Sequence, residues 1–476
     1  MTVEHAVETR RAECPTIPVL VPAEALLGNA RWRRTSRTNC FGTNLGRSAA
    51  DCTADSRGTR PGDLGTMSSS PGATYATGER ARCIASVPGN GERTVFAVGT
   101  QRLRGNNAVH FVAHDRDRDA LVARGVYKHH PEIWDLQPSP TSDALVATLY
   151  NPSSPSQNHG GAVWRVPGDG EDTSGSKALE SVAPFPETNG AARCVRWRVG
   201  VGVDPSAPAT GGTLAVADEK TLRLFQLDAS SNAAMAIAAT SDSFGDDAPG
   251  APVAGAWDPH SANAFAIVSG THGALHRDDG VCVYDTRTMR VSFVIPNPSS
   301  SRRAGCRFAD VEFDPRRPNK AFTAGDDGLA RAWDLRKPTN PTSVFAGHEH
   351  WVRRVCANPV YDLLVTASAD GTARLWRHGE TFSCDTREDD EERKTNGSNG
   401  NESKTSLSKA RGGDFPATKT DDDDVGPVET YGAPGGTSVC GVAWSFADPW
   451  SFASLEGDGA VALRVVPRAE KYRILL

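Results

Sequence analysis

Short apolar runs separated by turn residues recur along most of this chain. The clearest example, Gly347–Arg377, reads GHEHWVRRVCANPVYDLLVTASADGTARLWR. It holds three apolar runs, with Asn358-Pro359 between the first two and Asp370-Gly371 between the last two. Apolar runs of this length, bounded by Asn, Asp, Pro and Gly, are typical of strands joined by tight turns. The stretch therefore predicts three short strands, the last of which ends on Trp376.

Six further groups of apolar runs follow the same pattern, and each group predicts one small sheet. The runs are 95–98, 108–113 and 120–126; 130–136, 144–150 and 162–166; 194–198, 213–217 and 221–227; 253–257, 264–268 and 280–285; 309–313, 321–324 and 329–334; and 438–444, 452–455 and 460–465. Many short strands in series predict an all-β fold in which small sheets repeat around an axis. We expect a β-propeller of seven four-stranded blades, with six blades as the fallback. Because a free edge would expose unpaired backbone groups, we expect Ala81–Val87 to close the ring beside Ala460–Val465.

A Gly-His pair followed by a Trp about 25–30 residues later, in a unit of about 40–45 residues, marks a WD40 blade. Gly347-His348 and Trp376 match this signature, although Arg377 stands where the family has Asp. The chain thus resembles WD40-repeat proteins, in which a loop His, a Ser or Thr of the second strand, the turn Asp and the Trp hydrogen-bond in series. The positions that match these structural roles are His348, Thr366 or Ser368, Asp370 and Trp376, with Asp327, Trp333 and Asp334 in the preceding blade.

A His, an Asp and a Ser in one motif also raise the alternative of a hydrolase triad. The structural interpretation is favoured, because a buried imidazole and a buried Trp N–H each need a hydrogen-bond partner. The chain has no P-loop, G-x-S-x-G or H-E-x-x-H motif, and no G-x-G-x-x-G after a strand. His348, Glu349 and His350 suggest a metal site, but the first is the expected blade His, and His129 is interpreted as a loop residue. We therefore expect no catalytic residue, no cofactor and no metal, in a protein that is not an enzyme.

Composition is consistent with short strands and a protein-binding role. Hydrophobic residues make up 38% of the 476 positions, and 46 Gly and 31 Pro supply turns. The formal net charge of -6, without a basic stripe, argues against nucleic acid as a partner. No run of about 18 apolar residues is present, which argues against direct membrane insertion. Ten scattered Cys without a C-x-x-C pair suit free thiols in a reducing compartment.

Two segments lack the strand pattern. Residues 1–80 are rich in Gly, Ser, Thr and Arg and are predicted to be a disordered N-terminal extension of a propeller spanning 81–476. Because the repeat pattern begins soon after Met67, that residue is an alternative start, and the residues before it a candidate mis-start. Residues 381–427 hold EDDEER and DDDD and are predicted to be an acidic disordered loop inserted in the propeller. A docking or phosphorylation segment is the alternative for this loop.

The C-terminal run Ala447–Leu476 resembles a narrower family. Its matching residues are Val466-Pro467-Arg468, Lys471-Tyr472 and Ile474-Leu475-Leu476. They are similar to the tail of the WD40 proteins that interact with the endosome-associated recycling complex (EARP) and the Golgi-associated retrograde complex (GARP). Further matches are Val98-Gly99-Thr100, Glu132-Ile133-Trp134, Tyr284-Asp285-Thr286-Arg287 and the acidic insertion. The family has Trp in place of Tyr284 and no long extension before Met67.

The resemblance implies a non-enzymatic scaffold or adaptor that binds subunits of these tethering complexes in endocytic recycling and retrograde vesicle traffic. It also implies a cytoplasmic protein at the periphery of the trans-Golgi network and endosomes, and a monomeric propeller within a larger assembly. Lys471, Tyr472 and Leu475 in the tail are candidate partner-docking residues, with packing against a blade as the alternative.

A substrate receptor of a cullin-type ubiquitin ligase is the competing function. Trp333-Asp334-Leu335-Arg336, and more weakly Tyr284-Asp285-Thr286-Arg287, resemble the W-D-x-R box with which some WD40 receptors dock the adaptor of the ligase. A guanidinium just past the third strand of a blade can bind an acidic surface through two hydrogen bonds. Arg336 and Arg287 are therefore also candidate docking residues.

Overall fold

The structure is a computed structural model, and its described residues all lie within one compact unit, Asp63–Leu476. The described ranges are 72–88, 93–103, 105–129, 131–150, 160–168, 173–175, 177–185, 192–199, 212–218, 221–228, 233–239, 252–269, 280–297, 306–379 and 426–476. The predicted extension before residue 72 lies outside them, and so does the predicted acidic loop apart from residues 426 and 427.

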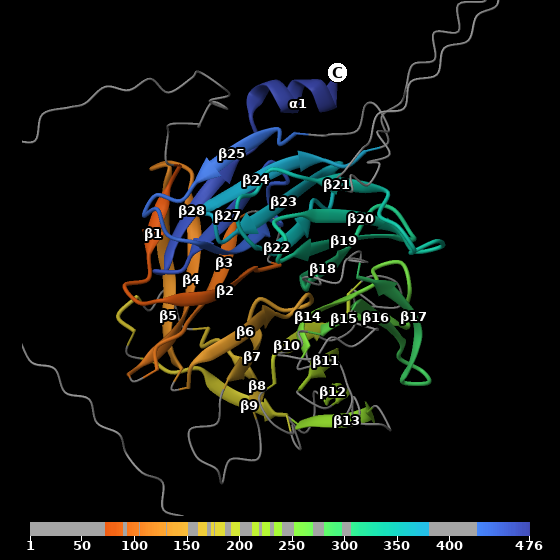
Figure 1. Ribbon diagram of the computed structural model, residues 1–476. Coiled ribbons are helices and arrows are strands. Elements are labelled where there is room, and N and C mark those ends of the chain that lie inside the picture. Colours follow the sequence, from red (N-terminus) through yellow and green to blue (C-terminus); the bar gives the residue numbers. More distant parts are fainter. Residues whose placement is uncertain are drawn as a thin grey trace, which may run out of the picture. The chain divides into compact units, whose positions relative to one another are not determined.

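The described chain folds almost entirely into strands, which form seven four-stranded antiparallel sheets (Figure 1). We number these sheets as blades 1 to 7. Their inner strands are, in order, β2 (Ala81–Ser86), β6 (Ile133–Pro138), β10 (Cys194–Trp197), β14 (Pro252–Trp257), β18 (Phe308–Phe313), β22 (Val352–Ala357) and β26 (Val439–Trp444). Each inner strand contacts the inner strands of both neighbouring blades, and β26 contacts β2, so the ring is closed. The predicted propeller of seven blades, rather than six, is confirmed.

The other strands of each blade follow outward in chain order. The second strands are β3 (Val95–Thr100), β7 (Leu145–Tyr150), β11 (Thr213–Ala217), β15 (Ala264–Ser269), β19 (Lys320–Gly325), β23 (Leu363–Ser368) and β27 (Ser451–Glu456). The third strands are β4 (Asn107–Asp115), β8 (Gly161–Arg165), β12 (Leu222–Asp228), β16 (Gly280–Asp285), β20 (Ala330–Asp334), β24 (Thr372–Arg377) and β28 (Ala460–Val465). The outer strands are β5 (Ala120–His129), β9 (Glu180–Pro184), β13 (Ala233–Ala239), β17 (Arg290–Pro296), β21 (Ser343–Phe345), β25 (Glu429–Gly432) and, in blade 7, β1 (Thr74–Ala76).

The ring is closed by β1, which supplies the outer strand of blade 7. Tyr75 lies opposite Val461 of β28, and the Thr77 N–H donates to the Gly459 carbonyl at 3.1 Å. We predicted this pairing for Ala81–Val87, and that assignment is wrong, because β2 within this segment is the inner strand of blade 1. The propeller therefore includes residues before Ala81. The closing strand has only three residues, too few to show a strand pattern in the sequence.

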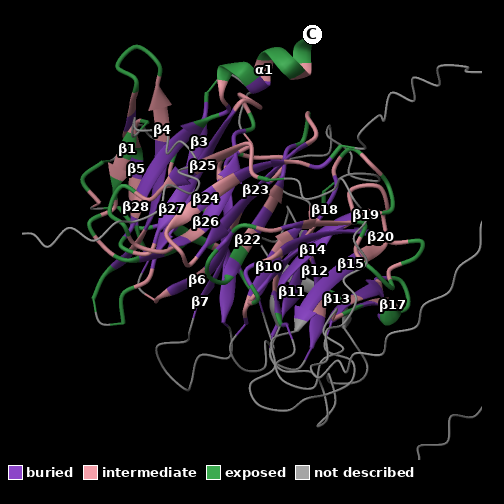
Figure 2. Cartoon of the chain, turned by 45° about the horizontal axis from the view of Figure 1, so that its top comes forward, coloured by how far each residue is buried: buried purple, intermediate pink, exposed green. Residues whose placement is uncertain are grey.

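Packing of blade against blade explains why the described residues of the second strands are almost all buried. Every residue of β23 is buried, because this strand is central in its sheet and both faces of the sheet are covered (Figure 2). Blades 5 and 6 meet in one such core, where Phe322 and Phe345 pack with Leu364 and Trp376.

One helix is present in the part of the chain that the structure describes, α1 (Arg468–Leu475), which follows β28. It is too short to cross a bilayer. In the described part of the chain, no helix is both long enough and apolar enough to do so.

Candidate functional site

Four polar side chains of blade 6 hydrogen-bond in series. The Trp376 Nε1–H donates to Thr366 Oγ1 at 2.9 Å, and the Thr366 hydroxyl lies 2.7 Å from Nε2 of His348. Nδ1 of His348 lies 2.7 Å from Oδ2 of Asp370. Burial lowers the pKa of His348, so a neutral imidazole that donates from Nδ1 and accepts at Nε2 satisfies every bond. The side chains predicted from the repeat signature therefore meet, with Thr366 at the centre.

Ser368, the alternative to Thr366, has a different role. Its hydroxyl donates to the carbonyl of His350 at 3.0 Å and accepts the N–H of Asp370 at 3.1 Å. Of these two hydroxyls, the one that faces Nε2 of His348 is that of Thr366, which is fully buried in the sheet, while Thr372 Oγ1 lies 3.3 Å from Nδ1. This arrangement stabilises the blade and supplies no Ser-His pair of the kind that a hydrolase triad needs.

Two other blades contain parts of the same hydrogen-bond series. In blade 2, Trp164 donates to Thr148 at 2.7 Å and Thr148 lies 3.0 Å from Nε2 of His129, so His129 is a blade residue and not a simple loop residue. The signal that could have revealed it is spacing, since His129 precedes its Thr by 19 residues and His348 precedes its Thr by 18. In blade 5, Trp333 donates to Thr323 at 2.9 Å. Asp327, the predicted turn Asp of that blade, pairs with Arg331.

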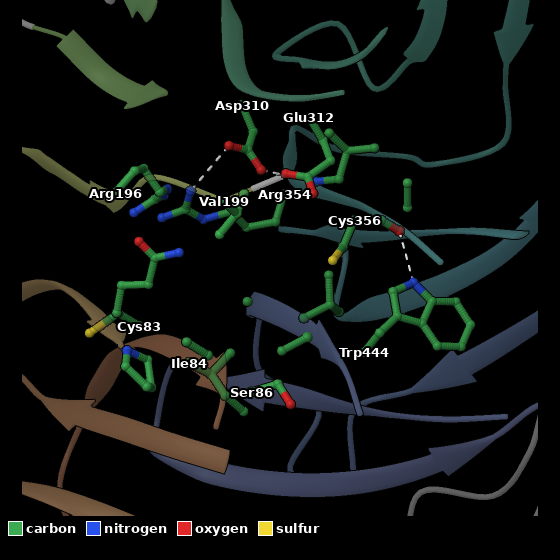
Figure 3. Close-up of a pocket in the computed structure, with 18 of the residues that line it drawn as sticks. Cys83, Ile84, Ser86, Arg196, Val199, Asp310, Glu312, Arg354, Cys356 and Trp444 are labelled. Atoms are coloured by element: carbon green, nitrogen blue, oxygen red, sulfur yellow. Dashed lines mark hydrogen bonds and ion pairs between the residues drawn. The ribbon is translucent and has the colours of Figure 1, made fainter. Parts of the chain in front are cut away.

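The inner strands surround a central cavity of about 380 Å³ that holds two ion pairs, and Figure 3 shows the one between Arg354 and Asp310. Arg196 Nη1 lies 2.5 Å from Asp135 Oδ2, and Arg354 Nη1 lies 3.2 Å from Asp310 Oδ1. Each carboxylate also accepts a backbone N–H from the inner strand of the following blade, at 3.0 Å from Val195 and 3.1 Å from Val355. Burial alone would lower the pKa of Arg196, but the neighbouring Asp135 raises it, so the guanidinium group stays charged. These pairs join blade 2 to blade 3 and blade 5 to blade 6.

A third carboxyl group and two thiols also line this cavity. Glu312 lies near Asp310 and Arg354 in Figure 3, and burial raises the pKa of Glu312 to about 8. Burial likewise raises the pKa of the Cys83 thiol to about 12, and it raises the pKa of Cys356. Thiols in this state are protonated near neutral pH and are poor nucleophiles.

The two arginines of the W-D-x-R pattern are exposed on the outside of their blades. Arg336 Nη2 lies 2.6 Å from Asp334 Oδ2, and Arg287 Nη2 lies 2.8 Å from Asp285 Oδ2. The hydrogen bond from each arginine lowers the pKa of its aspartate, to about 2 for both Asp334 and Asp285. A partner carboxylate would therefore have to compete with the neighbouring aspartate for each guanidinium.

The C-terminal helix α1 has one side against the blades and one side in solvent. Glu470 is buried and lies 2.8 Å from Nε of Arg377, and Ile474 packs on the core between blades 6 and 7. Lys471 lies 5.6 Å from the ring centroid of Trp450, so it contributes to the attachment of the helix. Tyr472 and Leu475 are 64% and 62% exposed. Of the three docking residues predicted in the tail, these two are therefore free to contact a partner.

Metal-ligating groups do not gather in the described residues, where no three His, Cys, Asp or Glu side chains could hold an ion together. Within blade 6, Nδ1 of His350 accepts the N–H of Trp351 at 2.8 Å, while His348 is bonded to Thr366 and Asp370. The His348-Glu349-His350 run thus uses its two imidazoles in separate hydrogen bonds.

The geometry of a closed propeller agrees with comparisons with known proteins. A family model described as the EIPR1 beta-propeller matches residues 68–376. The chain belongs to this family. The resemblance recognised in the sequence is thereby confirmed.

Relatives of the EIPR1 propeller match the chain over nearly their whole length. The EARP and GARP complex-interacting protein 1 of Macaca fascicularis is 31% identical over 421 residues, which are 84% of this chain and 98% of that protein. The Homo sapiens protein of the same name is 30% identical over 421 residues, with the same coverage of both chains. The WD repeat-containing protein DWA2 of Arabidopsis thaliana is 29% identical over 398 residues, 83% of this chain and 97% of that protein.

Proposed function

We propose that this EIPR1-type propeller is a non-enzymatic adaptor that binds subunits of the EARP and GARP tethering complexes. The observation that carries the proposal is the similarity to proteins named for this interaction, at 30–31% identity over 98% of their length. A closed ring is suited to such a role, because it is rigid and displays turns on two faces and strands on its flank.

The adaptor acts in endocytic recycling and in retrograde vesicle traffic. In this proposal it is a cytoplasmic protein, peripheral to the trans-Golgi network and endosomes, and it reaches membranes through the tethering complexes rather than by insertion. It works as one propeller within a larger protein assembly, with protein partners and no nucleic acid.

The outward side of α1 is the proposed docking surface for a tethering subunit. Glu470 and Ile474 hold the helix against blades 6 and 7, so its position is set by the propeller. Tyr472 and Leu475, three positions apart on the helix, remain exposed together with Leu476. Exposed apolar side chains on a fixed helix are the usual anchors when a helix enters the groove of a partner.

Affinity purification with mass spectrometry tests both parts of the proposal. Tagged full-length chain is expressed in cells and its co-purified proteins are compared with those of a Tyr472→Ala, Leu475→Ala double variant. Subunits of EARP or GARP are expected with the wild type and are expected to decrease at least about tenfold with the double variant. Arg473→Ala is the matched control, because Arg473 is exposed on the same helix and is not one of the apolar anchors. Absence of tethering subunits from the wild-type sample would refute the adaptor function.

A substrate receptor of a cullin-type ligase is the second candidate, favoured by the exposure of Arg336 and Arg287 just past the third strands of their blades. Their side chains are 73% and 69% exposed, and each is held in a fixed pose by its aspartate. Arg336→Ala distinguishes the two functions. The receptor function predicts that a ligase adaptor co-purifies with wild type and is lost in this variant, whereas the tethering function predicts no change in tethering subunits.

A further inference from the structure

One backbone hydrogen bond recurs at the end of the inner strand in all seven blades, and we call this shared arrangement the frame. In every blade, the first residue after the inner strand donates its N–H to the carbonyl of the first residue of the second strand, at 2.8–3.0 Å. The donors are Val87, Ser139, Arg198, Asp258, Asp314, Asn358 and Ser445. Residues at the same number of positions before or after these donors are therefore structurally equivalent around the ring.

The residue after each donor is apolar in all seven blades. These residues, which we call the rim, are Pro88, Pro140, Val199, Pro259, Pro315, Pro359 and Phe446. All of them except Pro259 line the central cavity, so the rim surrounds one mouth of the channel. Phe446 is 64% exposed, and Val199 is also exposed. Pro359 is exposed as well, and the other four prolines are half-buried. A partly exposed apolar ring around an opening is a surface that a partner can cover.

Glu312 lies inside this mouth, two residues before the donor Asp314 of blade 5. The equivalent residue of blade 2 is Gln137, whose Oε1 accepts the N–H of Trp197 in the next inner strand at 2.6 Å. Glu312 makes no hydrogen bond to a described residue, although it occupies the same place in the frame. A carboxyl group enclosed in the channel without such a bond is available to a ligand.

The groups that face Glu312 are Asp310 on its own strand, Arg196 on β10, and Arg354 and Cys356 on β22. Both arginines already pair with an aspartate, Arg196 with Asp135 and Arg354 with Asp310. Each of these guanidinium groups is thus neutralised by its own aspartate, and Arg82 also lies within electrostatic range of Asp135 and Arg354. Glu312 has no such ion-pair partner of its own among the described residues, so a cationic ligand would supply one, whereas a purely apolar ligand would cover the carboxyl group without a partner.

We propose that the rim and Glu312 bind a segment of a protein partner in which a Lys or Arg is flanked by apolar residues. The cationic group would lie at Glu312, and the apolar neighbours would pack on Phe446, Val199 and the prolines. This inference deepens the proposed adaptor function, since it states the chemistry of one segment that the partner presents.

The proposal has a pH signature. Burial holds the pKa of Glu312 near 8 in the free protein, so the carboxyl is largely protonated at pH 7. A bound cation favours the carboxylate and displaces this proton. Binding therefore strengthens as pH rises toward about 8, by up to about tenfold per pH unit, and levels off above it. Calorimetry in buffers of different ionisation enthalpy measures the released proton directly.

Peptide selection tests the proposal on the full-length chain. A display library of random dodecapeptides is selected on wild type, and the enriched peptides are measured by calorimetry on wild type, Glu312→Gln and Phe446→Ala. Each enriched peptide is also made with citrulline in place of its arginine, or norleucine in place of its lysine, which removes the charge at similar size. Glu312→Gln should fold, because Gln already stands at the equivalent position 137.

The expected result is enrichment of a basic residue between apolar residues. Affinity should fall at least about tenfold on removal of the peptide charge and by a similar factor in Glu312→Gln, which also loses the pH dependence. Phe446→Ala should weaken binding and keep the pH dependence. Enrichment of acidic or uncharged peptides, equal binding to Glu312→Gln, or no enrichment overturns the proposal. Self-association of the chain that Glu312→Gln abolishes also overturns it, because the occupant would be a second copy.

Purification of tethering subunits with Glu312→Gln separates this inference from the adaptor function. If the wild type retrieves no EARP or GARP subunit, the adaptor function fails. If the wild type and Glu312→Gln retrieve the same subunits in equal amounts and no basic peptide is selected, only the channel inference fails.

Discussion

Replacement of Trp376 measures how much the hydrogen-bond series of blade 6 contributes to stability. The side chain is 0% exposed and lies between Phe345 and His348, with ring centroids 5.7 and 6.1 Å away. Trp376→Ala removes these contacts and leaves a cavity between blades 5 and 6, which costs about 3–5 kcal/mol of unfolding free energy. Trp376→Phe keeps most of the volume and loses the bond to Thr366, so its cost is about 1–2 kcal/mol.

Urea denaturation followed by far-ultraviolet circular dichroism measures both costs without relying on tryptophan fluorescence. Trp351→Ala is the matched control, because Trp351 precedes β22 in the same blade and is 53% exposed. Its cost should lie within about 0.5 kcal/mol of zero. If Trp376→Ala were as mild as Trp351→Ala, the assignment of Trp376 to a core between blades would be refuted.

Three further perturbations test the closure of the ring by β1, the ionised state of Asp370 and the predicted inserted loop. A chain that begins at residue 77 lacks β1 and should unfold at a lower urea concentration than a chain that begins at residue 72, because the outer edge of β28 is then unpaired; equal midpoints would contradict closure by β1. Although burial opposes it, the hydrogen bond from His348 lowers the pKa of Asp370, so the carboxylate stabilises the fold above its ordinary pKa of about 3.9 and loses this effect as pH falls. Asp370→Asn should cost about 1–3 kcal/mol at pH 7 and progressively less below about pH 4, in parallel urea titrations; a constant difference would argue against a hydrogen bond from His348 to an ionised Asp370. Removal of residues 385–424 should change the unfolding free energy by about 1 kcal/mol or less, because closure entropy depends weakly on loop length; loss of soluble protein would contradict an inserted loop.

The sequence predicted the blades through local patterns and failed where the pattern is weak. The inner three strands of blades 2 to 7 are apolar runs because neighbouring blades cover them. Some outer strands are not: β9 reads ESVAP and β25 reads ETYG, since an edge strand needs few buried side chains. The three-residue β1 gives even less signal, and this explains why the closing strand was assigned to the segment that follows it. His348, Thr366, Asp370 and Trp376 could be found because they lie within one repeat.

The central channel could not be predicted in the same way. Asp135 and Arg196 are 61 residues apart and come from different blades, so no local spacing relates them. Which side chains of an inner strand face the channel also depends on the irregularity in its register, as between Phe308 and Asp310 in β18. The rim was also missed: five of its seven members are proline, but only the shared backbone position shows that they surround the channel.

Because equivalent positions occur in all seven blades, a residue that differs from its equivalents can be examined for a structural or a functional reason. In the blade series, blade 2 replaces the turn Asp with the carbonyl of Pro131, which lies 3.0 Å from Nδ1 of His129, so the departure is compensated within the fold. At the channel mouth, Gln in place of Glu312 would keep the volume, and in blade 2 the equivalent Gln137 accepts the N–H of Trp197 from the next inner strand. A carboxylic acid at this position costs desolvation and gains no hydrogen bond from a described residue. Since no described contact gives this acid a stabilising role in the ring, the proposed cationic segment accounts for a feature that the fold itself does not require.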